Sequence, residues 1–379
     1  MRTAFLGALF YGALVGCVGN SADNTPEKIP IVLIEETEEI AAEPTPTLDP
    51  VATPRPYRLR PGELVLASSP GDIPAIFAND NLFVSVEQGD LEWFDEEPVM
   101  GVEINGDARA YPVRILSLHE IVNDVVGGQP IAVTWCPLCY TAITFNRVLD
   151  RELTFGASGY LFHNNLVMYD HQSNTLWSQV LGEGIKGAYR TERLEIIPSV
   201  LTTWAAWKQT YPETKVLSAI QMGMLAEDVI DPYAGYYTSG APGLGGQEEL
   251  DERLLPKALV VGLRAAKIAR AYALVDIITA GVINDQIDLL PVLLVYNVDF
   301  QTVFTYDRRV GERTLVFSLD EDTGNLRDIE TDTVWDAKSG VALAGELKGE
   351  TLVRLSAPLV FWFAWSDIHK GTELYVLSE

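Results

Sequence analysis

The sequence is poor in the residues that carry much of protein chemistry, with only three cysteines and four histidines in 379 residues. Thiol chemistry is therefore limited to Cys17, Cys136 and Cys139. Basic residues are also scarce, because 27 lysines and arginines face 53 aspartates and glutamates, and the formal net charge is −26. A chain this acidic repels nucleic acid and anionic lipid headgroups, so we expect neither as a partner.

Several catalytic patterns are absent as well. The sequence has no Ser-His-Asp order typical of a hydrolase, no glycine loop that could hold a phosphate, and no HExxH zinc motif. We therefore expect no nucleotide cofactor and no hydrolytic chemistry. No catalytic residue can be named from the sequence.

Long apolar runs are missing too, and no stretch is both long and apolar enough for a membrane span of about 20 residues. Residues 1–17 begin with one positive charge, Arg2, and continue as a short apolar run, which is typical of a secretory signal. The run ends in Leu14-Val15-Gly16-Cys17, which resembles the bacterial lipobox; an ordinary signal peptide with a chance cysteine is the alternative. We expect an extracytoplasmic lipoprotein, anchored to the bacterial cell membrane by lipid on Cys17, in a compartment that permits disulfides.

The rest of the chain divides by composition and by an internal repeat. Residues 18–60 are rich in Glu, Pro and Thr and predict a disordered tether. Further on, Arg109-Ala110-Tyr111 returns as Arg270-Ala271-Tyr272, at an offset of 161 residues. Other positions recur in the same order: Asn123-Asp124 with Asn284-Asp285, Asp170 with Asp328, Trp177 with Trp335, Gly182 with Gly340, and Gly187 with Gly345. We distinguish a first unit (residues 61–218), an irregular connector rich in Gly and Tyr (219–256), and a second, degenerate unit (257–379).

The predicted fold class is α+β and β-rich, with two pseudo-repeated lobes, each a small, mostly antiparallel sheet or barrel with two helices. In the first unit, a strand at 99–105 turns at Asn105-Gly106, a strong hairpin signal. Apolar spacing predicts a helix over 115–126 that ends at Gly127-Gly128. The segments PIAVTW and TAITFNR predict two strands with CPLC between them, and a Trp-rich helix is expected at 202–210.

The segments ARAYPVRILSLHEIVNDVVGG, VTWCPLCYTAITFNR, LTFGASGYLFHNNLVMYD and FWFAWSDIHKGTELY resemble one known family, the bacterial domain of unknown function numbered 3179. The resemblance covers residues 62–379 in register. It implies a secreted or membrane-anchored protein but no activity, because the family is itself defined by unknown function. The family usually has glycine after its second cysteine, where this sequence has Tyr140.

Cys136 and Cys139 form a Cys-Pro-x-Cys turn between two predicted strands, which is typical of a metal-binding knuckle. A strand rather than a helix follows the turn, and this disfavours a thioredoxin-like site. Closing so short a loop with a disulfide would stabilise the fold by only about 2 kcal/mol. In the second unit Asn297 and Phe300 stand at the two cysteine positions. The repeat therefore indicates that the fold does not require the thiols.

Two further residues complete the predicted metal site. His119 lies on the apolar stripe of the predicted helix, its ring is expected to point inward, and Ala280 replaces it in the second unit, so we expect it as a third ligand. Met168, opposite Leu326, is a weaker candidate for a fourth. Two thiolates, an imidazole and a thioether suit a copper or a zinc ion.

Two alternatives to a metal site remain open at this stage. Cys136 and Cys139 can form an inert disulfide in a binding or scaffold module, which would present its lobes to a protein partner of the cell envelope. They can also act as a thiol–disulfide redox pair. His163 and His171 lie in a polar segment and are expected to be solvated, while Asp170 is expected to tie a turn.

Overall fold

The computed structural model describes residues 58–244, 250–320 and 322–377. Cys17, the predicted signal segment and nearly all of the predicted tether lie outside the described residues. Several small sheets and six α-helices make up the described part, which confirms the β-rich α+β class, although none of the sheets closes into a barrel. No helix within these ranges is long and apolar enough to cross a membrane.

The first unit contains three five-stranded sheets, which we call sheets I, II and III. Sheet I contains β14 (Val200–Thr203), β4 (Pro98–Ile104), β5 (Asp107–Pro112), β15 (Lys215–Leu217) and β3 (Phe83–Ser85), in that order. Sheet II contains β13 (Ile196–Ile197), β8 (Thr141–Asn146), β7 (Gln129–Cys136), β6 (Ile121–Val126) and β2 (Ile76–Phe77). Sheet III contains β1 (Leu64–Leu66), β9 (Phe155–Phe162), β10 (Asn165–Asp170), β11 (Leu176–Ser178) and β12 (Glu183–Lys186). The helices are α1 (Val86–Gly89), α2 (Val113–His119) and α3 (Trp204–Thr210).

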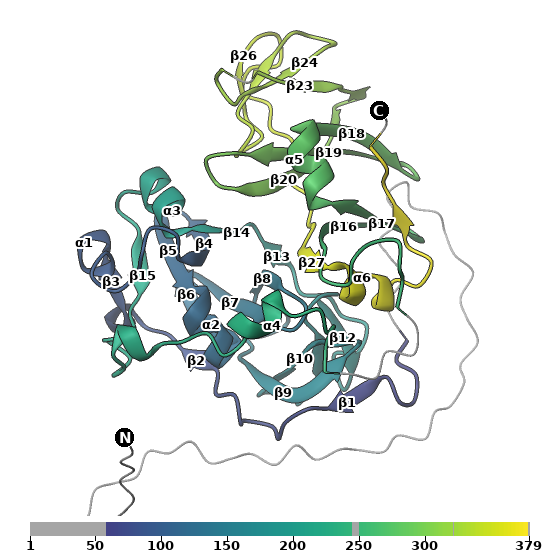
Figure 1. Cartoon of the computed structure of the whole chain (residues 1–379). Helices are drawn as coiled ribbons and strands as arrows, with labels where there is room; N and C mark the ends of the chain where they lie inside the picture. The colour runs from purple at the N-terminus through teal and green to yellow at the C-terminus, as the bar shows by residue number, and fades with distance from the viewer. Residues whose placement is uncertain (1–57, 245–249, 321, 378–379) are drawn as a thin grey trace, which may run out of the picture. The chain divides into compact units, whose positions relative to one another are not determined.

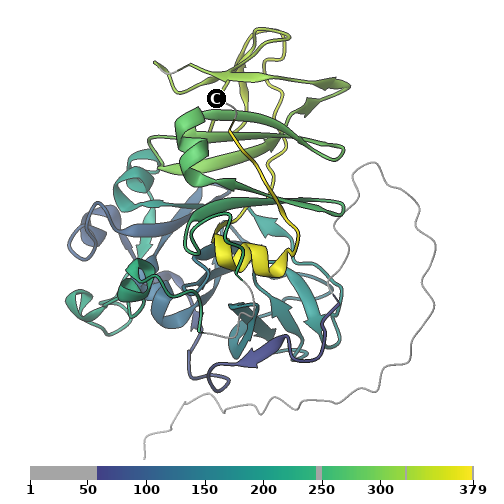
Figure 2. The ribbon, with the colours of Figure 1, turned by 45° about the vertical axis from the view of Figure 1, so that its right-hand side comes forward.

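The second unit repeats this order of strands with fewer members. Its sheet I′ contains β27 (Leu359–Phe361), β16 (Leu259–Ala265), β17 (Ile268–Ala273) and β28 (Glu373–Leu374). Sheet II′ contains β18 (Val282–Ile287), β19 (Leu290–Asn297) and β20 (Thr302–Asp307), and a hairpin of β21 (Arg309–Val310) and β22 (Arg313–Thr314) follows. Sheet III′ contains β23 (Phe317–Leu319), β24 (Leu326–Asp328), β25 (Val334–Trp335) and β26 (Ala342–Ala344). The helices are α5 (Leu274–Ala280) and α6 (Trp362–Ile368), and α5 packs against β16, β17 and β19 (Figures 1 and 2).

Most local predictions agree with these elements. The predicted hairpin at Asn105-Gly106 joins β4 to β5, with both turn residues at positive φ. The strands on either side of CPLC are β7 and β8, which pair directly. The Trp-rich helix is α3, and the Thr203 side chain caps its first turn.

The helix predicted over 115–126 is wrong in its second half. Helix α2 ends at His119, and Ile121–Val126 form strand β6, which pairs with β7. Glu120 stops the helix because its backbone turns to a φ of +58°. The following residues, IVNDVV, are mostly β-branched and suit a strand. Gly127-Gly128 is the turn of the β6–β7 hairpin rather than the end of a helix.

The recurring polar residues make the same hydrogen bonds in both units. In the first unit Arg109 and Tyr111 donate to the buried carboxylate of Asp124, at 3.0 and 2.7 Å. In the second, Arg270 and Tyr272 donate to Asp285 in the same way, and Tyr272 does so at 2.7 Å. These bonds tie the first hairpin of each unit to its next sheet.

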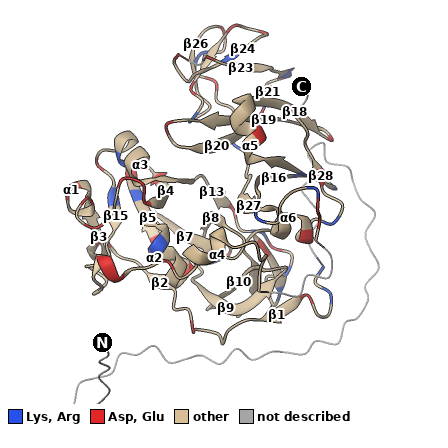
Figure 3. Ribbon diagram, in the orientation of Figure 1, with Lys and Arg blue, Asp and Glu red and all other residues tan. Residues whose placement is uncertain are grey.

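The recurring Asp and Trp residues lie in the third sheet of each unit. The indole of Trp177 donates to Asp170 at 3.0 Å, and that of Trp335 donates to Asp328 at 2.8 Å. Asp170 also accepts from the backbone N–H of Ser173 at 2.6 Å, so it ties a turn as predicted. Asp and Glu residues occur across the elements of both units rather than on one of them (Figure 3).

All described residues belong to one compact unit, and its two repeats meet at the turns that follow β7 and β19. The carbonyl of Cys139 accepts from the backbone N–H of Phe361 at 2.9 Å. The carbonyl of Phe300, which stands at the Cys139 position, accepts from the Thr202 hydroxyl at 2.5 Å. Each repeat therefore bonds its CPLC turn, or the equivalent of that turn, to the strand before the Trp-rich helix of the other.

Candidate thiol site

The CPLC turn is a tight connection between β7 and β8. Cys136 is the last residue of β7 and lies opposite Thr141, the first residue of β8. Tyr140 has a φ of +59°, the conformation that glycine adopts most readily. Its ring contacts Trp135, Tyr237 and Phe361, with ring centroids 5.1 to 5.4 Å apart. These aromatic contacts offset the backbone strain, so the turn forms with tyrosine at this position.

Both thiols are buried and free. Cys136 is 1% exposed and Cys139 is fully buried, and neither forms a disulfide. The Cys139 thiol lies 3.7 Å from the carbonyl oxygen of Cys136, and the Cys136 thiol lies 4.0 Å from that of Asn164. Burial raises the pKa of Cys139 well above its usual range, and the neighbouring Cys136 thiol raises it further. Cys139 is thus a protonated thiol until something stabilises its thiolate.

Met168 is a buried residue of β10, at the centre of sheet III. It belongs to the same packed cluster as Cys136 and Cys139, together with Trp177 and Leu138. The thioether and the two thiols therefore belong to one buried apolar cluster, which also includes residues of the second unit such as Trp365.

His119 is not part of the buried cluster that contains the two thiols. It is only half-buried at the end of α2, and its Nδ1 lies 2.7 Å from the carbonyl oxygen of Pro74. The expected inward stripe depended on a longer helix, since Val122 and Val126 lie on strand β6. Within the part of the chain that the structure describes, no three His, Cys, Asp or Glu side chains form a group able to hold a metal ion. Cys136, Cys139 and His119 accordingly do not form one.

The other predicted histidines have protein partners. His163 is paired through Nδ1 with Asp367 at 3.1 Å and through Nε2 with Glu63 at 3.6 Å. His171 bonds the carbonyl oxygen of Thr154 at 2.9 Å. Both side chains are half-buried. The expectation that they are solvated is therefore only partly met, because each ring is bonded to other residues and remains partly exposed.

Part of the connector covers the CPLC turn. Its short helix α4 (Ala234–Thr238) carries Tyr236, whose hydroxyl donates to the carbonyl of Leu138 at 2.8 Å. The same hydroxyl accepts from the backbone N–H of Gly243 at 2.9 Å. Burial raises the pKa of Tyr236 to about 12, and the thiols of Cys136 and Cys139 add to the shift. The segment predicted as irregular thus contains a helix that lies against the thiols.

Glu120 is a functional candidate that sequence reasoning missed. It is 9% exposed, and burial raises its pKa to about 7. Its carboxylate and the Cys136 thiol both raise the pKa of Tyr233, so all three groups share one region. In the second unit Gly281 stands at this position, with a φ of +68°. The signal available in the sequence was the aligned repeat, which has an acid, Glu120, where the second unit has a glycine.

The equivalent turn of the second unit is built without sulfur. Asn297 replaces Cys136, and its side chain accepts from the backbone N–H of Phe300 at 2.9 Å. Gln301, which stands at the Tyr140 position, has a φ of +50°. The same backbone turn therefore forms with an amide and an aromatic side chain in place of the two thiols.

Comparison with known proteins adds a family but no activity. No curated protein and no solved structure matches the chain significantly. A family model described as a protein of unknown function, DUF3179, matches residues 70–372, which include most of both units and the whole connector. The chain therefore belongs to the DUF3179 family.

Proposed function

We propose that the protein is an extracytoplasmic lipoprotein, held at the membrane by lipid on Cys17, whose first unit binds a soft metal ion through Cys136 and Cys139. The observation that carries this proposal is the pair of adjacent free thiols, both at most 1% exposed, at the end of one strand hairpin. Buried thiols next to each other can share a metal ion as thiolates. The ion supplies the positive charge that stabilises them against burial.

Copper in its Cu(I) state fits the ligand set better than zinc. A closed zinc site uses four ligands drawn from Cys, His, Asp and Glu. The described residues offer only the two thiols, because no third such side chain joins them. Thiolates and thioethers are the donors that favour Cu(I), and Met168 lies in the same buried cluster. We therefore take Met168, rather than His119, as the third residue of the site.

The comparison between the repeats supports a function over a structural role for the thiols. The turn of the second unit keeps its backbone shape with Asn297 and Phe300. A fold that can build this turn without sulfur does not need two thiols to do so. The raised pKa of Cys139 argues against a reactive redox thiolate in the free protein.

The test is a Cu(I) titration of reduced protein in which Cys17→Ser leaves Cys136 and Cys139 as the two remaining thiols. Competition with a chromophoric Cu(I) chelator should report one ion per chain. Cys136→Ser and Cys139→Ser should each abolish binding, and Met168→Leu should lower the affinity roughly tenfold. His119→Ala is the matched control, and it should leave the affinity unchanged.

Three outcomes would contradict the metal proposal. In the first outcome, protein isolated without air carries no copper and has a Cys136–Cys139 disulfide that mild reductant leaves intact, and the pair is then structural. In the second outcome, the reduced protein does not retain Cu(I), and the oxidised protein exchanges its Cys136–Cys139 disulfide with small thiols, as a redox protein would. Full Cu(I) affinity in Cys136→Ser would place any copper elsewhere.

A further inference from the structure

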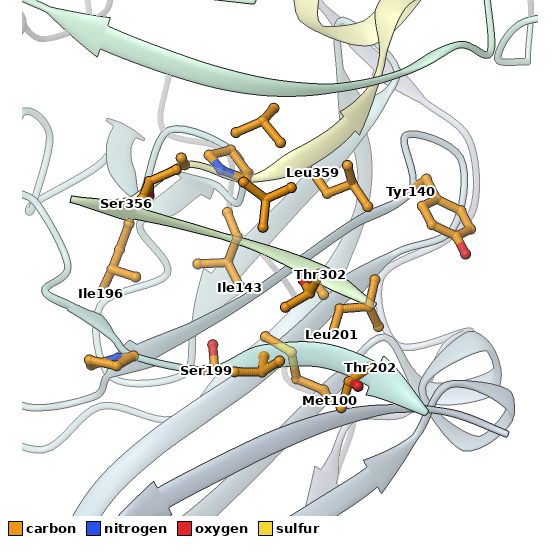
Figure 4. Close-up of a pocket in the computed structure, with 18 of the residues that line it drawn as sticks. Met100, Tyr140, Ile143, Ile196, Ser199, Leu201, Thr202, Thr302, Ser356 and Leu359 are labelled. Carbon is orange, nitrogen blue, oxygen red and sulfur yellow. The ribbon is translucent and has the colours of Figure 1, made fainter. Parts of the chain in front are cut away.

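A cavity of about 400 Å³ lies between the two repeats (Figure 4). It is lined by strands β14 and β27, which precede helices α3 and α6, and by the turn residues Tyr140 and Gln301. The walls come from both repeats: Met100, Ile143, Ile196 and Leu201 belong to the first, and Thr302 and Leu359 to the second. Most of the lining is aliphatic. A volume of this size is within the range of sites for small molecules.

Arg354 is the only charged residue among those that line this cavity. Its guanidinium lies over the ring of Phe304, 4.8 Å from the ring centre. Burial lowers the pKa of Arg354, and the nearby hydroxyls of Tyr306 and Tyr211 only partly offset this. A positive charge is therefore held at a largely apolar wall.

The charge of Arg354 is uncompensated. The side chain is half-buried, and among the described residues it makes no hydrogen bond and no ion pair. The other arginines shielded from water all have such a partner: Arg109, Arg114, Arg147, Arg193, Arg264, Arg270, Arg308 and Arg309. In a chain with a net charge of −26, acidic partners are abundant. An unpaired, half-buried arginine is costly, and this cost falls when an anion binds.

We propose that this cavity binds a small amphiphile with one carboxylate, whose apolar body lies along the aliphatic wall and whose carboxylate pairs with Arg354. The planar guanidinium matches a carboxylate with two parallel hydrogen bonds. The hydroxyls of Ser199, Thr302 and Ser356 also line the cavity and make no hydrogen bonds with described residues, so they can donate to the same group. The site goes beyond the metal proposal and does not depend on it, although Tyr140 contributes to the cavity wall.

The experiment is calorimetric titration of the purified chain carrying Cys17→Ser with decanoate and with decyltrimethylammonium. We expect one decanoate per chain and at least tenfold weaker binding of the cation. Arg354→Gln should weaken decanoate binding at least tenfold, whereas Arg313→Gln, which removes an exposed charge of the same sign, should leave it unchanged. Ser199→Phe, which fills the cavity without changing charge, should abolish binding.

Several results would overturn the proposal. These are no measurable decanoate binding, equal affinity for the cation, or unchanged decanoate affinity in either Arg354→Gln or Ser199→Phe. If decyl phosphate bound at least tenfold more tightly than decanoate, the assignment of a carboxylate would be overturned. The double variant Cys136→Ser/Cys139→Ser separates the two proposals, because it should lose Cu(I) and keep decanoate.

Discussion

Glu120 and Tyr140 are two residues of the first unit that hold a positive φ near the thiols. Their counterparts in the second unit are Gly281 and Gln301, and both of these also have a positive φ. A non-glycine residue in this region costs about 1 to 3 kcal/mol. Tyr140 offsets this cost by aromatic contacts, but Glu120 has no such compensation, since its buried carboxyl makes no hydrogen bond with described residues.

Replacing Glu120 should make stability depend less on pH. Burial raises the folded-state pKa from 4.5 to about 7, so the folded protein binds a proton that the unfolded chain releases. The wild type should therefore lose stability as pH rises from 4.5 to 7, by about 3 kcal/mol in total. Glu120→Gln should not show this loss, and its stability relative to wild type should rise over the same interval.

Urea denaturation at several pH values between 4.5 and 8 measures the effect. Glu96→Gln, which changes an exposed glutamate, is the matched control and should follow the wild type across the range. A Glu120→Gln profile parallel to that of the wild type would mean that the carboxyl is solvated in the folded protein.

At the scale of elements, a buried Arg–Asp–Tyr set joins the first hairpin of each unit to its second sheet. Asp124 is 2% exposed and Asp285 is 18% exposed, while their partners are equivalent. Since a buried charge loses more when its partner is removed, the same substitution should have different effects in the two units.

Asp124→Ala should lower the free energy of unfolding by about 3 kcal/mol, because it leaves the guanidinium of Arg109 and the hydroxyl of Tyr111 short of a buried partner. Asp285→Ala should cost about 1 kcal/mol, since water reaches that site. Chemical denaturation monitored by tryptophan fluorescence gives both values. Equal losses would indicate that the two sites are equally hydrated in solution.

The same elements show what periodicity could not decide. The stretch ILSLHEIVNDVV reads as one amphipathic helix, yet its second half is a central strand of sheet II. A short apolar segment can be buried equally well by either structure. The choice was made by β7 and by the pairing across Gly127-Gly128, which are interactions outside the segment itself.

At the scale of the whole molecule, the two repeats exchange one hydrogen bond each at their turns. The Thr202 hydroxyl donates to the Phe300 carbonyl, and both groups are buried. Thr202→Val keeps the shape of the side chain and removes the donor. It should lower the free energy of unfolding by about 1 to 2 kcal/mol, because a buried carbonyl loses its partner.

Thr302→Val is the control for this substitution. Thr202 and Thr302 both line the cavity that contains Arg354, but the Thr302 hydroxyl makes no hydrogen bond with described residues. It should change stability by less than about 0.5 kcal/mol. If the two variants had equal thermal midpoints, the bond between the repeats would contribute nothing to the stability of the whole chain.

The sequence by itself determined the β-rich class, the hairpin at Asn105-Gly106, the strands on either side of CPLC and the family. These depend on local chemistry, because turn residues and alternating side chains act over a few positions. The aligned repeat also identified Asp170 and Asp328 as residues that tie turns, since the same short loop recurs around each.

Only the tertiary structure decided which residues meet. It placed Met168 in the cluster of the thiols, left His119 on the carbonyl of Pro74, and put Arg354 at an apolar cavity without a carboxylate. Each of these depends on contacts between segments far apart in the chain. The energy of a buried thiol, acid or guanidinium is set by what surrounds it, and the neighbours in sequence are only a small part of those surroundings.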